Sequence, residues 1–327
     1  MTQMRQGAKF RHAGRRAGMV LAAGMLASGM AGQALGAEGG VGFYILGSRT
    51  INAGIVPPPG TYLQFSTYGF SGYSNVATPQ NGRINLGLSG DALIGLYTAV
   101  WSLDSEPVLG GQPYLAATLP IGWKKTTLDG QLARPGGNIV SGSRDKDSYL
   151  IGDPVIGGGI GWGEGPWFTS LNLLINIPAG DYETGRPTNV SFNRWGADLT
   201  GGITWMNANG WQVSGALGLT VNGENDDTNY NTGNELHLEG AVAKTTGSWT
   251  LGLAGYHYNQ VSGDSSETPL LGEFKGRVSG IGPVIGWSGM WGQQPVSLDA
   301  RFYHEFDAKN RVEGNTVLFN LTIPLGG

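Results

Sequence analysis

Tryptophan is concentrated beside short turns in this chain, and this placement constrains the fold more than any other feature. Eight of the ten tryptophans flank five turns, with the sequences DSEP, GEGP, NANG, TTGS and GQQP. Indole is amphipathic and favours the boundary between membrane and water. Strands with such a belt, joined alternately by short turns and long polar loops, are typical of a transmembrane β-barrel. The predicted belt consists of Trp101, Trp162, Trp167, Trp205, Trp211, Trp249, Trp287 and Trp291 on the short-turn side, with Trp195 and Trp123 at the opposite boundary.

The first 37 residues have the composition of a secretory signal peptide. Five basic residues lie within 5–16, a small-residue apolar stretch covers 17–34, and ALGA offers cleavage after Gly36 or Ala37. Removing this segment leaves 15 Lys and Arg against 24 Asp and Glu, a net charge near −9. A surplus of acidic residues argues against a nucleic-acid partner.

Two further absences narrow the class of protein. The chain has no cysteine, which excludes thiolate catalysis, disulfides and cysteine metal sites. Its mature part has no run of 18 apolar residues that would form a membrane-spanning helix. Glycine, in contrast, is abundant at 58 of 327 residues, and in strands it marks bends and close packing.

Alternation of polar and apolar residues predicts the strands. Trp195 and Trp205 share one face and are ten residues apart, which at about 3.3 Å per residue and a tilt of about 40° spans roughly 25 Å, the height of an apolar band between aromatic belts. We expect an all-β antiparallel up-and-down barrel of about twelve strands, with ten or fourteen as alternatives. The expected strands are 60–70, 84–102, 108–127, 149–163, 167–178, 193–206, 211–222, 235–246, 249–260, 276–290, 295–306 and 315–325.

Every second connection is long, and this predicts the orientation. The long ones are 71–83, 128–148, 179–192, 223–234, 261–275 and 307–314. Bacterial barrels place short turns in the periplasm and long loops outside, so both termini are expected in the periplasm. Alternation is weak in 84–102, 149–163 and 276–290, and a β-bulge after Gly255 would explain the unclear facing of the residues that follow it.

Residues 38–59 precede the barrel, which we assign to 60–327. The triple proline Pro57–Pro59 cannot donate hydrogen bonds to a strand ladder. The segment could be a periplasmic tail or a plug folded into the lumen. The apolar sequence GFYILGSRTINAGIV favours the plug.

The same alternation predicts charged residues that face the lumen. Functionally they would line a permeation path; the alternative is a structural network that braces the barrel interior, which pairing of Arg301 with acids on neighbouring strands would support. The candidates are Arg194, Asp198, Glu235, His237, Glu239, Asp299, Arg301 and Glu305.

Enzymatic and metal chemistry find little support in the sequence. Glu235, His237 and Glu239 could share an ion from one strand face, but barrel interiors are commonly charged, and we assign no metal and no cofactor. There is no G-x-S-x-G sequence, no P-loop and no complete G-x-G-x-x-G. We therefore expect no enzyme.

Several stretches resemble one known family. They are GSRTINAGIVPPPGTYLQ, GDYETGRPTNVSFNRWGADLTGGITW, NGENDDTNYNTGNELHLEGAV, YHYNQVSGDSS and GEFKGRVSGIGPVIGW. Together they are similar to the family of outer-membrane transporters named for the MetA pathway of phenol degradation, over nearly the whole mature chain. The resemblance implies a membrane barrel associated with uptake of aromatic or other hydrophobic compounds.

The hypothesis from the sequence is a passive channel in the bacterial outer membrane for small hydrophobic or aromatic solutes. A lumen of twelve strands falls between small barrels filled by side chains and the water-filled porins of 16 to 18 strands. The expected partners are the solute and outer-membrane lipid. The alternative is a closed structural barrel whose long loops contact a surface partner without transport.

Overall fold

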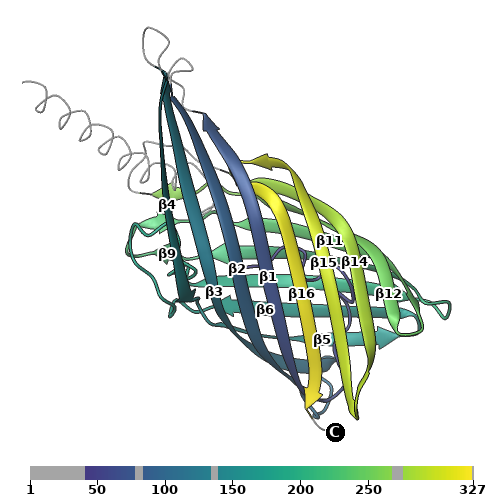
Figure 1. Cartoon of the computed structure of the whole chain (residues 1–327). Coiled ribbons are helices and arrows are strands. Elements are labelled where there is room, and N and C mark those ends of the chain that lie inside the picture. The colour runs from purple at the N-terminus through teal and green to yellow at the C-terminus, as the bar shows by residue number, and fades with distance from the viewer. Residues whose placement is uncertain (1–40, 78–83, 134–138, 267–274, 326–327) are drawn as a thin grey trace, which may run out of the picture.

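The sheet closes into a barrel of twelve antiparallel strands, as the sequence predicts (Figure 1). The computed structural model describes residues 41–77, 84–133, 139–266 and 275–325; the predicted signal peptide lies outside them. Sequential neighbours pair around the wall, and the β1–β2, β2–β3 and β1–β16 pairings complete the ring. Its strands are β1 (Gly60–Ala77), β2 (Ile84–Ser102), β3 (Gln112–Ala133), β5 (Val155–Glu164), β6 (Trp167–Asn176), β7 (Gly196–Met206), β8 (Trp211–Asn222), β11 (Glu235–Thr246), β12 (Trp249–Gln260), β14 (Arg277–Trp291), β15 (Gln294–Lys309) and β16 (Glu313–Leu325).

Alternation sorts the side chains to the two faces of the wall. On β11, Leu236 and Leu238 are exposed outward, while the intervening His237 is buried at 1 % exposure. After Gly255 the side chains continue to alternate between the inward and outward faces. No bulge interrupts them, because β12 pairs in continuous register with both neighbouring strands. The register shift lies instead between β14 and β15, at Arg277 and Ser279.

The tryptophans of the predicted belt lie on the outward face. Trp167 is paired with Trp205, and Trp249 with Trp287, across neighbouring strands. Six of the belt tryptophans are exposed, from 41 % at Trp101 to 75 % at Trp291, whereas Trp162, Trp205 and Trp287 are half-buried. Trp162 differs in that its indole N–H donates to the Leu109 carbonyl at 3.0 Å. Among the described residues, no helix is long and apolar enough to cross a membrane.

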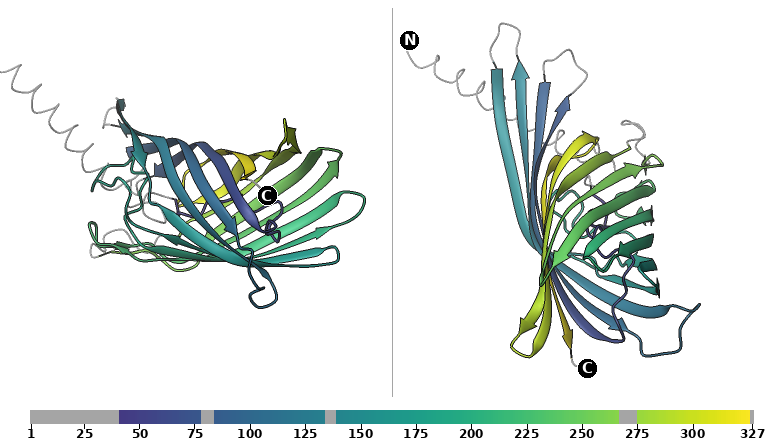
Figure 2. Two further views of the ribbon diagram at one scale, coloured as in Figure 1. Left: turned by 90° about the horizontal axis from the view of Figure 1, so that it is seen from below. Right: turned by 90° about the vertical axis from the view of Figure 1, so that its right-hand side faces the viewer.

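Four strands extend beyond the rest of the wall. In the right-hand view of Figure 2, β1, β2, β3 and β4 (Ile139–Ile151) rise as a blade above the other strands. Loops were predicted at 71–83 and 128–148. Both predicted loops are too long, because β1 extends to Ala77 and β3 extends to Ala133. A strand with water on both faces does not require alternation, so the sequence pattern fades there.

The predicted strand 149–163 is two strands separated by a break. β4 ends at Ile151, β5 begins at Val155, and both pair with β3. Within the described residues, β4 has β3 as its one partner strand, so its other edge carries no ladder. Short strands in the long loops, β9 (Glu224–Asn225), β10 (Tyr230–Asn231) and β13 (Ser265–Ser266), form a separate small sheet.

Asp153, in the break, holds the loop of residues 177–195 against the wall. Its carboxylate, 2 % exposed, accepts hydrogen bonds from the Gly180, Phe192 and Asn193 amides at 3.0, 2.8 and 3.1 Å and from side chains of Asn176 and Ser191. The loop also meets the free edge of β4, where the Asp181 amide donates to the Ile151 carbonyl at 2.8 Å. This loop therefore covers part of the edge that lacks a partner strand.

Replacing Asp153 is expected to loosen this loop. An Asp153→Asn variant loses the negative charge and offers a donor to backbone N–H groups, and each buried donor left unsatisfied costs about 1–3 kcal/mol. We expect protease cleavage within 177–195 to accelerate at least tenfold in intact cells. Glu183→Gln is the control, because Glu183 is exposed and makes a surface ion pair with Arg186 in the same loop. Equal cleavage of both variants would contradict the role given to Asp153.

Candidate functional site

The barrel interior is occupied by residues 41–59, here called the lumen segment. Tyr44, Leu46, Ile51 and Ala53 of this segment are all buried, at 9 % exposure or less. A Cβ added to Gly42 would lie 2.2 Å from Glu235 Oε2, next to a long loop, and one added to Gly54 would lie 2.2 Å from the Phe168 carbonyl oxygen, next to a short turn. The segment therefore runs through the lumen from the loop end to the turn end.

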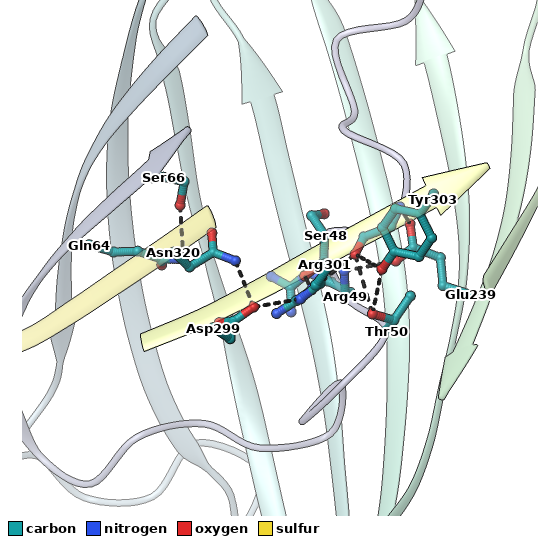
Figure 3. Close-up of polar contacts among 11 residues, drawn as sticks. Ser48, Arg49, Thr50, Gln64, Ser66, Glu239, Asp299, Arg301, Tyr303 and Asn320 are labelled. Carbon is teal, nitrogen blue, oxygen red and sulfur yellow. Dashed lines mark hydrogen bonds and ion pairs between the residues drawn. The ribbon is translucent and has the colours of Figure 1, made fainter. Parts of the chain in front are cut away.

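Glu239 and Arg301 hold the middle of the lumen segment from two sides (Figure 3). Glu239 accepts the Gly47 and Arg49 amides at 2.9 and 2.7 Å. The Arg301 guanidinium donates to the carbonyls of Gly47 and Ser48 at 2.9 and 2.6 Å. A charged partner makes these hydrogen bonds roughly twice as strong as neutral ones. We call this arrangement the Glu239–Arg301 clamp.

Gly47 is required by the geometry of this clamp. Its φ is +83°, in the left-handed region, and a Cβ would lie 2.5 Å from the Tyr303 ring. The Tyr303 hydroxyl donates to the Gly47 carbonyl at 2.9 Å and contacts the Thr50 hydroxyl at 2.9 Å. A side chain at position 47 would therefore displace the tyrosine that anchors the same peptide.

Arg301 is oriented by an acid on its own strand. Its Nε donates to Asp299 at 2.7 Å, and the Asn320 amide of β16 donates to the same carboxylate oxygen at 2.9 Å. The sequence left open pairing of Arg301 with acids on neighbouring strands. Instead, Arg301 is fixed by Asp299, two residues away, and its Nη1 donates to the lumen segment.

The turn end of the lumen segment is held by neutral groups. Thr204 accepts the Gly54 amide at 3.0 Å, Ser170 donates to the Ala53 carbonyl at 2.8 Å, and Gln212 donates to the Asn52 side chain at 2.8 Å. These contacts come from β6, β7 and β8, on the other side of the lumen from Arg301 on β15. The segment is thus fixed across the width of the barrel.

At the loop end, an Asp–His pair packs under Tyr44. His237 Nε2 lies 2.9 Å from Asp198, and the hydroxyls of Thr200 and Thr220 donate to the same carboxylate at 2.5 and 2.6 Å. The Tyr44 ring stacks on the imidazole with centroids 3.7 Å apart. Both carboxylate oxygens of Asp198 therefore have partners, and the histidine supports the lumen segment by contact of the two rings.

The predicted lumen residues separate into distinct groups. Glu239, Asp299 and Arg301 meet around the lumen segment, and Asp198 meets His237. Glu235 accepts a hydrogen bond from Asn222 at 3.0 Å, and Glu305 accepts the Tyr256 hydroxyl at 2.7 Å. Arg194 lies just before β7, 2 % exposed, with Nε donating to Asn222 at 3.2 Å and its guanidinium 5.3 Å from the Phe192 ring centroid. Within the described residues, no group of three or more His, Cys, Asp and Glu is arranged to hold a metal ion.

Sequence reasoning missed the neutral partners of the lumen segment. Arg49 donates to the Tyr114 hydroxyl at 3.2 Å, and Tyr114 donates to Asn172 at 2.6 Å. Ser170 and Asn172 alternate with the exposed Leu171 and Leu173. That alternation is a usable signal for neutral inward residues, whereas the predicted lumen set contains titratable side chains alone.

The chain belongs to the family described as "Putative MetA-pathway of phenol degradation", whose model matches residues 74–321. No curated protein matches the sequence.

Solved structures place the fold among outer-membrane barrels. The COG4313 outer membrane channel from Pseudomonas putida F1 is 11 % identical, with a TM-score of 0.59 over 86 % of this chain and 100 % of that chain. Weaker similarity is found to the toluene transporter TbuX from Ralstonia pickettii, at 8 % identity, 83 % and 90 % coverage and a TM-score of 0.39. The CymD monoaromatic hydrocarbon channel is 9 % identical over 82 % and 89 %, with a TM-score of 0.38. The protein therefore has the fold of an outer-membrane β-barrel.

A cysteine probe tests whether the clamp seats the lumen segment. The native chain has no cysteine, so Thr50→Cys introduces a single thiol at a position with 0 % exposure. We expect slow reaction with a water-soluble maleimide in this variant. Adding Glu239→Gln should accelerate labelling at least tenfold, because one carboxylate oxygen is replaced by an N–H donor that faces backbone donors.

Glu235→Gln is the matched control for this experiment. Glu235 is an inward carboxylate on the same strand that lies against Gly42 at the loop end of the lumen segment, but its hydrogen bond goes to Asn222 of the wall and not to the segment. Labelling should then stay at the rate of Thr50→Cys alone. Acceleration by both substitutions, or by neither, would show that the clamp is not what seats the segment.

Proposed function

We propose that the protein is a passive outer-membrane channel for small hydrophobic or aromatic compounds, in which the lumen segment acts as a plug. The observation that carries this proposal is the Glu239–Arg301 clamp, which holds the backbone of residues 47–49 inside a closed barrel. Membership of a family named for phenol degradation and the fold shared with an outer membrane channel support the same class of function.

Occupation of the lumen argues against general diffusion of polar solutes. Porins that pass water-soluble molecules freely have wide, open lumens of 16 to 18 strands. Here twelve strands surround a segment whose buried residues include Tyr44, Leu46 and Ile51. In our proposal, the charged residues of the lumen hold the plug in place. A solute passes only when the plug shifts within the barrel. No catalytic role is assigned to the charged residues.

An apolar hollow on the outward face of the wall supports a hydrophobic cargo. It measures about 340 Å³ and lies where β4 gives way to β5, next to Pro154 and Val155. Its outward rim is aromatic and aliphatic, with Phe65 and Tyr97 packed edge to face at 6.0 Å. The lining residues are Leu63, Phe65, Tyr97, Thr98, Ala99, Ala117, Thr118, Leu119, Pro154, Val155 and Ile156. In our proposal, a solute that prefers hydrocarbon to water binds in this hollow beside the break between β4 and β5.

Loosening the plug is expected to open the channel. In planar bilayers, we expect small or no conductance steps from the native protein and at least threefold larger steps from the double variant Glu239→Gln, Arg301→Ala. The reason is that both charged partners of residues 47–49 are then lost. Glu235→Gln is again the matched control, expected to conduct as the native protein does.

Uptake by whole cells tests whether the channel carries aromatic compounds. Cells lacking the gene should take up at least one aromatic compound more slowly, and the native gene should restore the rate. The alternative is a closed structural barrel, favoured by the dense hydrogen bonding of the interior. Absence of conductance from the double variant, together with unchanged entry of every aromatic tested, would replace the channel by that alternative.

A further inference from the structure

A hollow lies on the membrane-facing wall beside the tryptophan belt. It has a volume of about 400 Å³ and is lined by Trp167, Ile203, Trp205, Val213, Ser214 and Gly215. Glycines create it, because a Cβ on Gly201 would meet nothing within 4 Å and one on Gly215 nothing nearer than 3.6 Å. The neighbouring outward positions carry large side chains such as Leu199 and Leu217. The hollow is therefore a local gap in an otherwise filled apolar surface.

A lysine stands on the same outward face, close to the turn end of this hollow. Lys244 of β11 lies directly opposite Trp211 of β8, with its ammonium 5.2 Å from the indole centroid. Trp211 is two residues from Val213, which lines the hollow. In the described strands, no other Lys or Arg faces outward at the short-turn end. A cation over an indole at the membrane boundary is positioned to meet an anionic headgroup.

We propose that this surface binds an anionic phospholipid of the periplasmic leaflet, with its phosphate at Lys244 and Trp211 and an acyl chain in the hollow. Short turns mark the periplasmic side of bacterial barrels, so the phosphates of that leaflet lie at the height of this belt. The hollow extends from Trp205 and Trp167 at the belt toward Ile203 and Gly215 in the apolar band, the direction an acyl chain takes.

Charge on the far side of the hollow sets the orientation of the lipid. Glu164 of β5 lies opposite Trp167 and is exposed. Four inter-strand spacings of about 4.8 Å separate β5 from β11, so the acid and the lysine are at opposite sides. An anionic headgroup is attracted to the Lys244 side and repelled from the Glu164 side. The proposal depends on the outer-membrane fold and not on the channel activity.

The test is native mass spectrometry of the full-length mature protein with added phosphatidylglycerol or phosphatidylcholine of identical acyl chains. We expect the native protein to retain phosphatidylglycerol preferentially. Lys244→Gln should reduce the retained phosphatidylglycerol about fivefold, in line with one basic side chain near an anionic lipid, and leave phosphatidylcholine unchanged. Lys244→Arg should preserve the preference.

Two further variants make the test specific. Glu164→Gln, which removes a charge from the same belt, should leave phosphatidylglycerol binding unchanged or higher. Gly215→Leu should fill the hollow and reduce binding of both lipids. Equal retention of phosphatidylglycerol by the native protein, Lys244→Gln and Gly215→Leu would overturn the proposal. So would a native protein that shows no preference between the two lipids.

Discussion

Closure of the sheet through the β2–β3 pairing is the constraint on which the rest of the structure depends. In hydrocarbon, each unpaired backbone N–H or C=O costs several kcal/mol, so a membrane-spanning sheet must have no free edge at that depth. The β2–β3 ladder runs from Ile84–Leu132 to Ser102–Tyr114 without interruption. Where a neighbouring ladder is interrupted, beside β4, Asp153 and the loop of residues 177–195 supply hydrogen bonds in place of a strand.

The inward face of the closed barrel carries buried charges, and these need partners. A buried charge is tolerated when it is paired and hydrogen-bonded. Glu239 and Arg301 meet this condition through the backbone of residues 47–49, and Asp198 through His237 and two threonines. The lumen segment and the inward charges therefore stabilise one another. The local sequence around either partner does not reveal this contact.

What could be predicted from the sequence follows from the difference between the two faces of the wall. Where one face meets lipid and the other the lumen, alternation is sharp in strands such as β11 and β12, which have the predicted bounds of 235–246 and 249–260. In β14, burial alternates in the same way although the glycine-rich sequence alternates weakly. Where both faces meet water, as in β4, alternation carries no information and a loop was predicted. The partners of Arg301 were missed for a different reason: they are backbone carbonyls some 250 positions away in the chain, which no side-chain pattern records.

The wall holds the lumen segment both by its backbone and by its apolar side chains, because Tyr44, Leu46 and Ile51 belong to one buried cluster with residues of the wall. Glu239, Arg301, Ser170 and Thr204 all contact main-chain atoms of residues 47–54. If the segment leaves, its peptide groups and the two charged side chains can each hydrogen-bond to water that enters the lumen. Exchange of protein hydrogen bonds for water hydrogen bonds changes the free energy by only about 0.5–1.5 kcal/mol per neutral bond. The backbone hydrogen bonds therefore add little to the cost of displacing the plug, and the larger share comes from exposing the buried side chains of Tyr44, Leu46 and Ile51.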